Sequence, residues 1–161
     1  MSPVIAIYRI GNLFYRFHIP ILPKLFSLIN RIVFAVWLPS SARIGKQFTL
    51  GYWGLGIVIH SNSIIGNRVW ICQNVTIGRN FGDKKVPVIG NDVYIGTGSV
   101  IFGEIEIGDN VIIGSNSLIN RSIPSNCTVI GNPMKIILEN RSLKYYELDK
   151  CSKHGAFNNK S

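Results

Sequence analysis

The chain of 161 residues is long enough for one domain with small terminal elements. Its 47% hydrophobic content excludes a disordered chain, and 16 glycines among few charged residues favour a β-rich repeat over a helical bundle. The net charge of +9 indicates an anionic partner. The basic residues form neither a continuous run nor a nucleic-acid-binding motif, so we expect no nucleic acid. The three cysteines form no paired framework, which indicates a reducing compartment and the cytoplasm.

Residues 1–41 are apolar with interleaved basic residues, and their spacing predicts two short helices, over Pro3–Phe17 and Lys24–Trp37. Residues 21–39 approach the length of a membrane span, but the charged residues among them make a spanning helix unfavourable. Two compatible interpretations remain. The helices cover the open end of the domain that follows, or residues 1–40 lie at a membrane surface, on the inner face of the cell membrane, with their bases on anionic lipid.

A six-residue repeat dominates residues 42–137. Isoleucine recurs at intervals of six, with a single interval of twelve, at Ile59, Ile65, Ile71, Ile77, Ile89, Ile95, Ile101, Ile107, Ile113 and Ile119. A helix would need spacings of three and four, and a simple strand would need two. The pattern therefore predicts a solenoid in which each hexad supplies a short strand and a turn, and in which the isoleucines form one buried column. Residues 138–161 are polar and predict a C-terminal tail.

Two stretches interrupt the repeat. About three extra residues stand near Tyr52-Trp53-Gly54, and the twelve-residue interval contains residues 79–88. Uninterrupted repetition would place Asp83 in the isoleucine column, where burial of a lone carboxylate would cost several kcal/mol. We therefore expect residues 79–88 to leave the column as an exposed loop. Irregularities in a strict solenoid are the places where function is expected.

Four runs of the repeat resemble the hexapeptide-repeat acetyltransferases: Gly56–Asn67, Ile71–Gly78, Pro87–Gly96 and Val129–Ile137. The resemblance is to the serine acetyltransferase-like branch, particularly to members that O-acetylate bacterial surface polysaccharides. It implies an all-β solenoid, a left-handed parallel β-helix, here with a short α-helical N-terminal cap. It also implies a homotrimer that binds acetyl-CoA in the clefts between subunits, and a histidine that takes the proton from an acceptor hydroxyl.

His60 is the predicted catalytic base. It is the only histidine of the repeat region, and it occupies the corner position that glycine usually holds, so its side chain should point away from the core. Neutral imidazole suits proton abstraction because its pKa lies near the working pH. The alternative is an ordinary solvated histidine at a corner. No acid adjoins His60 in sequence, so an orienting carboxylate must come from elsewhere, with Asp83 and Asp92 as guesses.

The resemblance also assigns the coenzyme site. Thr97 and Ser115 match positions where the family's main chain and small side chains line the coenzyme A channel. Lys135, in the closing motif, is placed for a nucleotide phosphate, and Arg121 could serve in the same way. The alternative is that these are ordinary turn residues and a solvated lysine.

The acceptor site is assigned to the two irregular stretches. Tyr52 and Trp53 could stack on an acceptor or cover the thioester, or they could pack against the N-terminal cap. Lys84 of the loop could meet a coenzyme A phosphate or an anionic acceptor, or it could only make the loop soluble. We expect no metal, because a zinc-dependent carbonic anhydrase of this fold needs three histidines and the repeat region has one.

The chain departs from serine acetyltransferases at two positions. Trp53 stands roughly where their catalytic histidine lies, and Val86 stands at their second active-site histidine. The expectation from sequence is therefore an acetyl-CoA-dependent O-acetyltransferase that acts on a sugar hydroxyl in surface polysaccharide or glycan biosynthesis. The alternatives are a serine O-acetyltransferase of cysteine biosynthesis, which acts on a small-molecule acceptor, and a non-catalytic β-helix scaffold.

Overall fold

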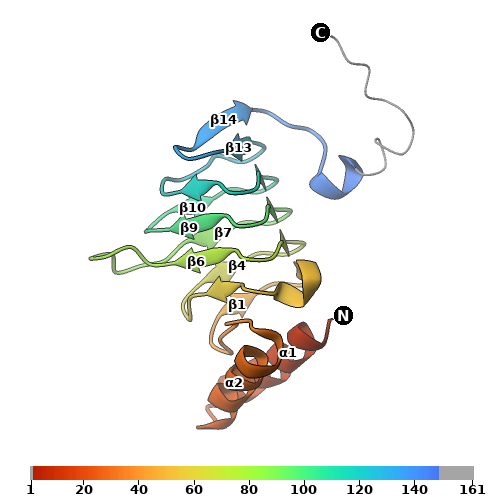
Figure 1. The fold of residues 1–161 in the computed structure, drawn as a ribbon, viewed down its shortest axis with the longest axis vertical. Helices are drawn as coiled ribbons and strands as arrows, with labels where there is room; N and C mark the ends of the chain where they lie inside the picture. Colours follow the sequence, from red (N-terminus) through yellow and green to blue (C-terminus); the bar gives the residue numbers. More distant parts are fainter. Residues whose placement is uncertain (1, 149–161) are drawn as a thin grey trace.

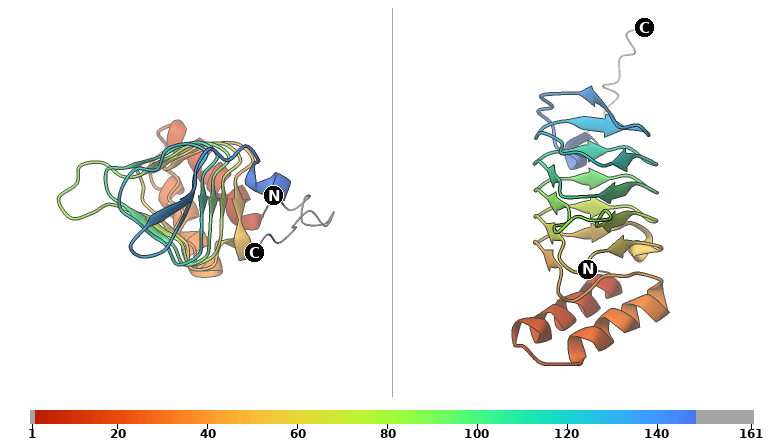
Figure 2. Two further views of the ribbon diagram at one scale, coloured as in Figure 1. Left: turned by 90° about the horizontal axis from the view of Figure 1, so that it is seen from above. Right: turned by 90° about the vertical axis from the view of Figure 1, so that its left-hand side faces the viewer.

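The computed structural model describes residues 2–148, which form a parallel β-solenoid closed at one end by two helices (Figure 1). Three sheets form the sides of the solenoid, and the view along its axis shows the coils stacked in register (Figure 2). The fold predicted from the repeat, a left-handed parallel β-helix with a helical N-terminal cap, is confirmed.

Each coil contributes one short strand to each sheet. Sheet A contains β3 (Val58–Ile59), β6 (Thr76–Gly78), β9 (Val100–Phe102) and β12 (Leu118–Ile119). Sheet B contains β1 (Arg43–Ile44), β4 (Ile64–Ile65), β7 (Val88–Ile89) and β10 (Glu106–Ile107). Sheet C contains β2 (Thr49–Leu50), β5 (Trp70–Ile71), β8 (Tyr94–Ile95), β11 (Ile112–Ile113), β13 (Thr128–Ile130) and β14 (Lys135–Leu138), and only its last pair is antiparallel.

The isoleucine column is the core of the solenoid. All ten repeat isoleucines are at most 2% exposed. Ile95 pairs with Ile113, three hexads further along the chain, so three hexads make one coil. Ile71 pairs with Ile95, four hexads further, because one hexad leaves the stack as the predicted loop. The loop over residues 79–87 contains no strand, projects from the side of the solenoid (Figure 2), and has Phe81 fully exposed.

The corners follow from the turn residues of each hexad. We call them the AB, BC and CA corners, after the sheets that they join. At the BC corner, side chains bond the coils together: the main-chain N–H of Asn67 donates to Oδ1 of Asn91 at 2.9 Å, and that of Asn91 donates to Oδ1 of Asp109 at 2.6 Å. Glycine is required at Gly66, because a Cβ atom there would lie 2.5 Å from the carbonyl oxygen of Gly90 in the next coil.

The helical hairpin covers the first coil. Helix α1 (Pro3–Arg16) packs on α2 (Leu22–Phe34). The buried Tyr8 hydroxyl donates to the carbonyl oxygen of Ala42 at 2.7 Å, and Asn12 Nδ2 donates to that of Ser40 at 2.7 Å. These bonds satisfy main-chain acceptors that the open end of a solenoid would otherwise leave unpaired. The predicted cap is therefore confirmed.

The second helix ends earlier than the sequence predicted. Ala35 has a left-handed backbone conformation (φ 55°), which ends α2 at Phe34. The N–H of Trp37 then donates to the carbonyl oxygen of Ile57 at 2.8 Å, and Trp37 pairs with Val58 in parallel. Trp37 therefore belongs to the first coil of the solenoid and not to the helix.

A C-terminal segment follows β14 and returns along the outside of sheet C (Figure 1). Tyr145 packs there against Trp70 and Tyr94, with ring centroids 6.2 and 5.9 Å apart, and its hydroxyl donates to the carbonyl oxygen of Arg68 at 3.1 Å. Within the predicted tail, residues 138–148 are thus in contact with the solenoid. Residues 149–161 lie outside the described part of the chain.

Candidate functional site

The residues singled out from the sequence fall at two different corners of the solenoid. His60 follows β3 and Lys84 follows β6, so both lie at the AB corner. Tyr52 and Trp53 follow β2, and Thr97 and Ser115 follow β8 and β11, so these four lie at the CA corner, with Lys135 just beyond it in β14. Sheet A separates the two groups within one chain.

His60 is half-buried at its corner, and its Nδ1 accepts a hydrogen bond from the main-chain N–H of Asn62 at 3.1 Å. A neutral imidazole with an acceptor at Nδ1 carries its proton on Nε2. In this tautomer Nε2 is therefore a hydrogen-bond donor. Nε2 can act as a base only in the other tautomer, in which Nδ1 carries the ring proton. No carboxylate contacts His60 within residues 2–148.

The two carboxylates considered as orienting groups differ in position. Asp83 lies on the loop at the AB corner, which is the corner of His60. Asp92 lies at the BC corner, where its carboxylate accepts from Arg68 Nε at 2.5 Å and lies 3.5 Å from Lys144 Nζ. Asp92 therefore serves the BC corner and does not contact His60.

The predicted coenzyme residues lie in adjoining coils. The N–H of Asn116, next to Ser115, donates to the carbonyl oxygen of Thr97 at 2.8 Å. Thr97 is half-buried and Ser115 is exposed, so both present small side chains at the CA corner. Lys135 is exposed in the last strand, whereas Arg121 donates to the carbonyl oxygen of Met134 at 2.9 Å and so has an internal partner.

Tyr52 and Trp53 project from a short 3₁₀ segment, Gly51–Gly54, that accommodates the extra residues. Both have a left-handed backbone (φ 47° and 56°), which is uncommon for bulky residues and marks a constrained turn. Trp53 packs edge-on against Phe34 at the end of α2, with ring centroids 6.1 Å apart, but 57% of it stays exposed. Tyr52 is 80% exposed and is available to a ligand or to another chain.

On the loop, Lys84 is exposed and forms no ion pair with the residues that the structure describes, while its neighbour Lys85 forms an ion pair with Glu104 of the next coil, with Nζ and Oε1 2.8 Å apart. That contact ties the base of the loop to the solenoid and leaves Lys84 free. The AB corner thus combines one imidazole with one free ammonium group.

Sequence reasoning missed a cluster on sheet C. Asp92 is joined there by Arg68, Lys144 and Tyr146, whose hydroxyl lies 3.4 Å from Asp92 Oδ1. The Arg68 hydrogen bond holds the pKa of Asp92 below its ordinary value, against the opposite effect of burial. The cluster fastens the C-terminal segment to the solenoid. The available signal was that Arg68 and Asp92 occupy equivalent hexad positions.

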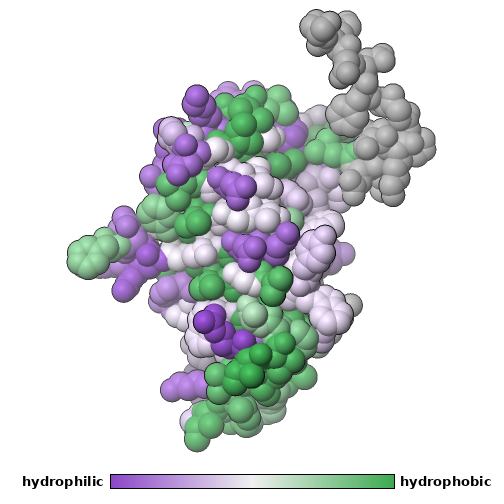
Figure 3. All heavy atoms as spheres, viewed as in Figure 1, coloured by the Kyte–Doolittle hydropathy of each residue, from purple (hydrophilic) through white to green (hydrophobic). Residues whose placement is uncertain are grey.

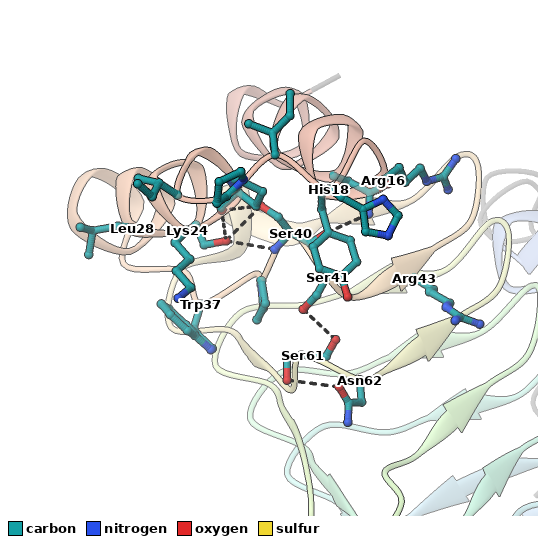
Figure 4. Close-up of a pocket in the computed structure, with 18 of the residues that line it drawn as sticks. Arg16, His18, Lys24, Leu28, Trp37, Ser40, Ser41, Arg43, Ser61 and Asn62 are labelled. Atoms are coloured by element: carbon teal, nitrogen blue, oxygen red, sulfur yellow. Dashed lines mark hydrogen bonds between the residues drawn. The ribbon is translucent and has the colours of Figure 1, made fainter.

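A groove of about 1230 Å³ also went unpredicted (Figure 4). It lies between the helical hairpin and the first coils, on the AB side of the solenoid. Its lining includes Arg16, Lys24 and Arg43, together with Ser61 and Asn62, which directly follow His60. Among the described residues, no carboxylate lines it. Within residues 2–148, no cluster of three or more histidine, cysteine, aspartate or glutamate side chains is arranged to hold a metal ion.

Comparison with known proteins agrees with this geometry. Residues 87–121 match the family described as bacterial transferase hexapeptide (six repeats). The serine acetyltransferase of Synechococcus elongatus is 35% identical over 132 residues, which are 81% of this chain and 54% of that protein. The serine acetyltransferase structure from Vibrio cholerae superposes with a TM-score of 0.81 at 31% identity, covering 88% of this chain and 55% of the other.

A serine acetyltransferase structure in complex with CoA also matches, with a TM-score of 0.76 at 30% identity, covering 83% of this chain and 55% of that one. The chain therefore spans about half the length of the relatives that it matches.

The coils of three hexads define a left-handed β-helix, and residues 87–121 match the bacterial transferase hexapeptide pattern. Relatives in Synechococcus elongatus, Bacillus subtilis and Staphylococcus aureus, which are 31–38% identical to this chain, are named serine acetyltransferases. This finding contradicts the expected sugar acceptor of surface polysaccharide biosynthesis. That expectation relied on the resemblance to members that O-acetylate polysaccharides and on the two substituted histidine positions, and neither observation identifies a sugar.

Proposed function

We propose that the chain is an acetyl-CoA-dependent O-acetyltransferase of the serine acetyltransferase type, with L-serine or a similar small hydroxyl compound as acceptor. The observation that carries this proposal is the match to serine acetyltransferases across four fifths of the chain, including a relative solved with CoA. Thr97 and Ser115, which lie in adjoining coils at the CA corner, are the side chains that we expect to line the coenzyme.

The division of the site between two corners supports a homotrimer. Within one chain, sheet A keeps His60 and Lys84 apart from the CA-corner residues. In a cyclic assembly every interface joins two different surfaces, so the AB corner of one copy can face the CA corner of the next. Each cleft then combines His60 of one subunit with Thr97 and Ser115 of its neighbour. The site is incomplete without the second copy.

In this cleft the acceptor hydroxyl attacks the thioester carbonyl carbon, so that a C–O bond forms as the C–S bond to coenzyme A breaks. His60 takes the hydroxyl proton and returns it to the departing sulfur. For this role Nδ1 must carry the ring proton. It must therefore give up the hydrogen bond that it accepts from the Asn62 N–H. Main-chain N–H groups at the corners stabilise the charge on the carbonyl oxygen.

One observation favours a second candidate, a non-catalytic β-helix scaffold. Trp53 stands where the family's catalytic histidine is expected, and Val86, which is buried, stands at the second histidine position. The two candidates differ in their ligands and in turnover. An enzyme binds coenzyme A and releases its thiol when serine is added, whereas a scaffold does neither.

The test is a thermal-unfolding titration of the full chain with coenzyme A, followed by a thiol-release assay with acetyl-CoA and L-serine. The proposal expects the melting temperature to rise with coenzyme concentration, because a ligand that binds only the native state stabilises it. It also expects thiol release that depends on serine. An unchanged melting temperature supports the scaffold, and turnover with a different small hydroxyl compound changes the acceptor but keeps the enzyme class.

A further inference from the structure

The helical hairpin carries an apolar surface that the solenoid does not cover. We call it the hairpin surface, and it consists of residues on the outer sides of both helices and their connection: Ile10, Leu13, Phe17, Ile21, Leu25, Leu28, Ile32 and Val33. Each of these side chains is at least 46% exposed, and Phe17, Ile21 and Ile32 are about 70% exposed. Figure 3 shows the apolar atoms gathered over the helical end of the molecule. A contiguous apolar surface of this kind indicates a partner.

Cationic side chains lie within this surface, and no acid does. The first acidic residue of the chain is Asp83, so all the charged residues of both helices and of the first coils are basic. Arg16, Lys24 and Arg31 are exposed, and none of them forms an ion pair within residues 2–148. Free cations beside exposed apolar side chains are the composition of helices that lie in a membrane interface.

The groove beside the hairpin adds positions for phosphate groups. Arg16 and Lys24 line it from the helical side, and Arg43 lines it from the first coil (Figure 4). Ile21 and Leu28 belong both to this groove and to the hairpin surface, so the two features are continuous. An anionic headgroup can therefore meet the cations while its acyl chains contact the apolar side chains.

We propose that the hairpin surface docks the protein on an anionic lipid bilayer. The helices lie across the end of the solenoid (Figure 2), so docking presents the flat side of the hairpin to the interface. Within the described residues, neither helix has the length and apolarity that a membrane crossing requires. The binding mode is therefore interfacial, through partial burial of the apolar face and attraction to anionic lipid.

Charge decides between a bilayer and a second copy of the chain. A two-fold pairing of hairpin surfaces would bring two sets of the cations Arg16, Lys24 and Arg31 into one interface, with no acid in either helical hairpin to neutralise them. Anionic lipid supplies the opposite charge to all three. The bilayer is therefore the occupant that the composition of this surface fits.

The experiment is co-sedimentation of the full chain with vesicles of phosphatidylcholine alone and of phosphatidylcholine mixed with phosphatidylglycerol. We expect binding to the mixed vesicles only, with affinity that falls as salt is added. The double variant Lys24→Glu/Arg31→Glu should weaken binding by about 25-fold or more, because each basic residue near an anionic surface contributes about fivefold. The variant Ile32→Ser/Val33→Ser should weaken it through loss of apolar burial.

The matched control is the double charge reversal Arg79→Glu/Lys84→Glu, at two exposed positions on the loop, outside the hairpin surface. Its vesicle binding should change much less than that of Lys24→Glu/Arg31→Glu. Equal loss in both variants would mean that net charge alone acts, and it would overturn the proposal. Binding to neither vesicle, together with a concentration-dependent self-association that Ile32→Ser/Val33→Ser abolishes, would assign the surface to a second copy. Binding and turnover are separate measurements, so failure here leaves the proposed reaction standing.

Discussion

At the scale of single residues, the imidazole at the AB corner has the sharpest test. His60→Ala removes one side chain whose only hydrogen bond within residues 2–148 joins it to the N–H of Asn62, so the fold should be retained. If His60 is the general base, kcat/KM for thiol release should fall by about 10²-fold or more. The measurement is the thiol-release assay, with circular dichroism as the check on folding.

The matched control for this substitution is Asn120→Ala. Asn120 follows Ile119 as His60 follows Ile59, so both residues hold the same hexad position at the AB corner, and Asn120 is exposed. Its loss should leave kcat/KM nearly unchanged. Full activity in His60→Ala would remove the imidazole from the mechanism.

Asp92 offers a prediction about stability and pH. The Arg68 hydrogen bond lowers the pKa of this carboxyl from its ordinary 3.8. The charged form therefore stabilises the fold at pH values above 3.8. As the pH falls through the lowered native pKa, the carboxylate is protonated and the contribution disappears. Asp92→Asn should therefore reduce the free energy of unfolding by about 1–2 kcal/mol at pH 7.

Urea unfolding of the two proteins at pH 7 and at a pH far enough below 3.8 to lie under the lowered native pKa measures this difference. The gap between wild type and Asp92→Asn should close at the lower pH. A gap of the same size at both pH values would contradict the assigned role of the charge.

At the scale of elements, the attachment of α1 to the first coil depends on a few buried polar contacts. Tyr8 is 1% exposed, and its hydroxyl donates to the carbonyl oxygen of Ala42 at 2.7 Å. Tyr8→Phe should lower the free energy of unfolding by about 1 kcal/mol, because the ring still fits but the carbonyl loses its short hydrogen bond. Tyr15→Phe on the same helix, where 49% of the side chain is exposed, should change it by less than about 0.5 kcal/mol.

The solenoid could be predicted from sequence because its signal repeats. The inward isoleucine recurs at the same position of ten hexads, so ten weak indications of a buried column add up. Asp83 falls at that position in one further hexad and marks it as the hexad that leaves the stack. The contact between Arg68 and Asp92 was missed although its signal was present. With residues 79–87 out of the coil, the two residues hold equivalent positions in adjacent coils, but the hexad pattern does not state that their side chains form an ion pair.

The C-terminal segment shows a different limit. Tyr145 meets Trp70 and Tyr94 through aromatic packing that has no period in the sequence, and its partners lie far away along the chain. Polar composition alone suggested a tail. The same limit applies to the candidate site, because a periodic pattern places His60 and Thr97 at corners but does not state which corners share a cleft.

At the scale of the whole molecule, a site divided between copies can be tested by complementation. Ser115→Trp should block the coenzyme channel at the CA corner, where Ser115 is exposed, and His60→Ala removes the base at the AB corner. Each variant alone should be inactive. Mixed assemblies of the two should regain activity, because roughly a quarter of the clefts formed by random mixing contain neither substitution. If the mixtures were as inactive as either variant alone, His60 and Ser115 would not share a cleft between two copies. Both residues would then belong to a site within one chain, or to no site.

The distribution of charge along the solenoid has an electrical consequence. Eight basic residues and no acid precede Asp83, whereas residues 83–148 carry six basic and seven acidic side chains. The described molecule therefore has a permanent dipole moment with its positive end at the helices. In the field of any negatively charged surface it experiences a torque that turns this end forward before contact, and the effect fades once the separation exceeds the Debye length of about 8 Å at physiological ionic strength.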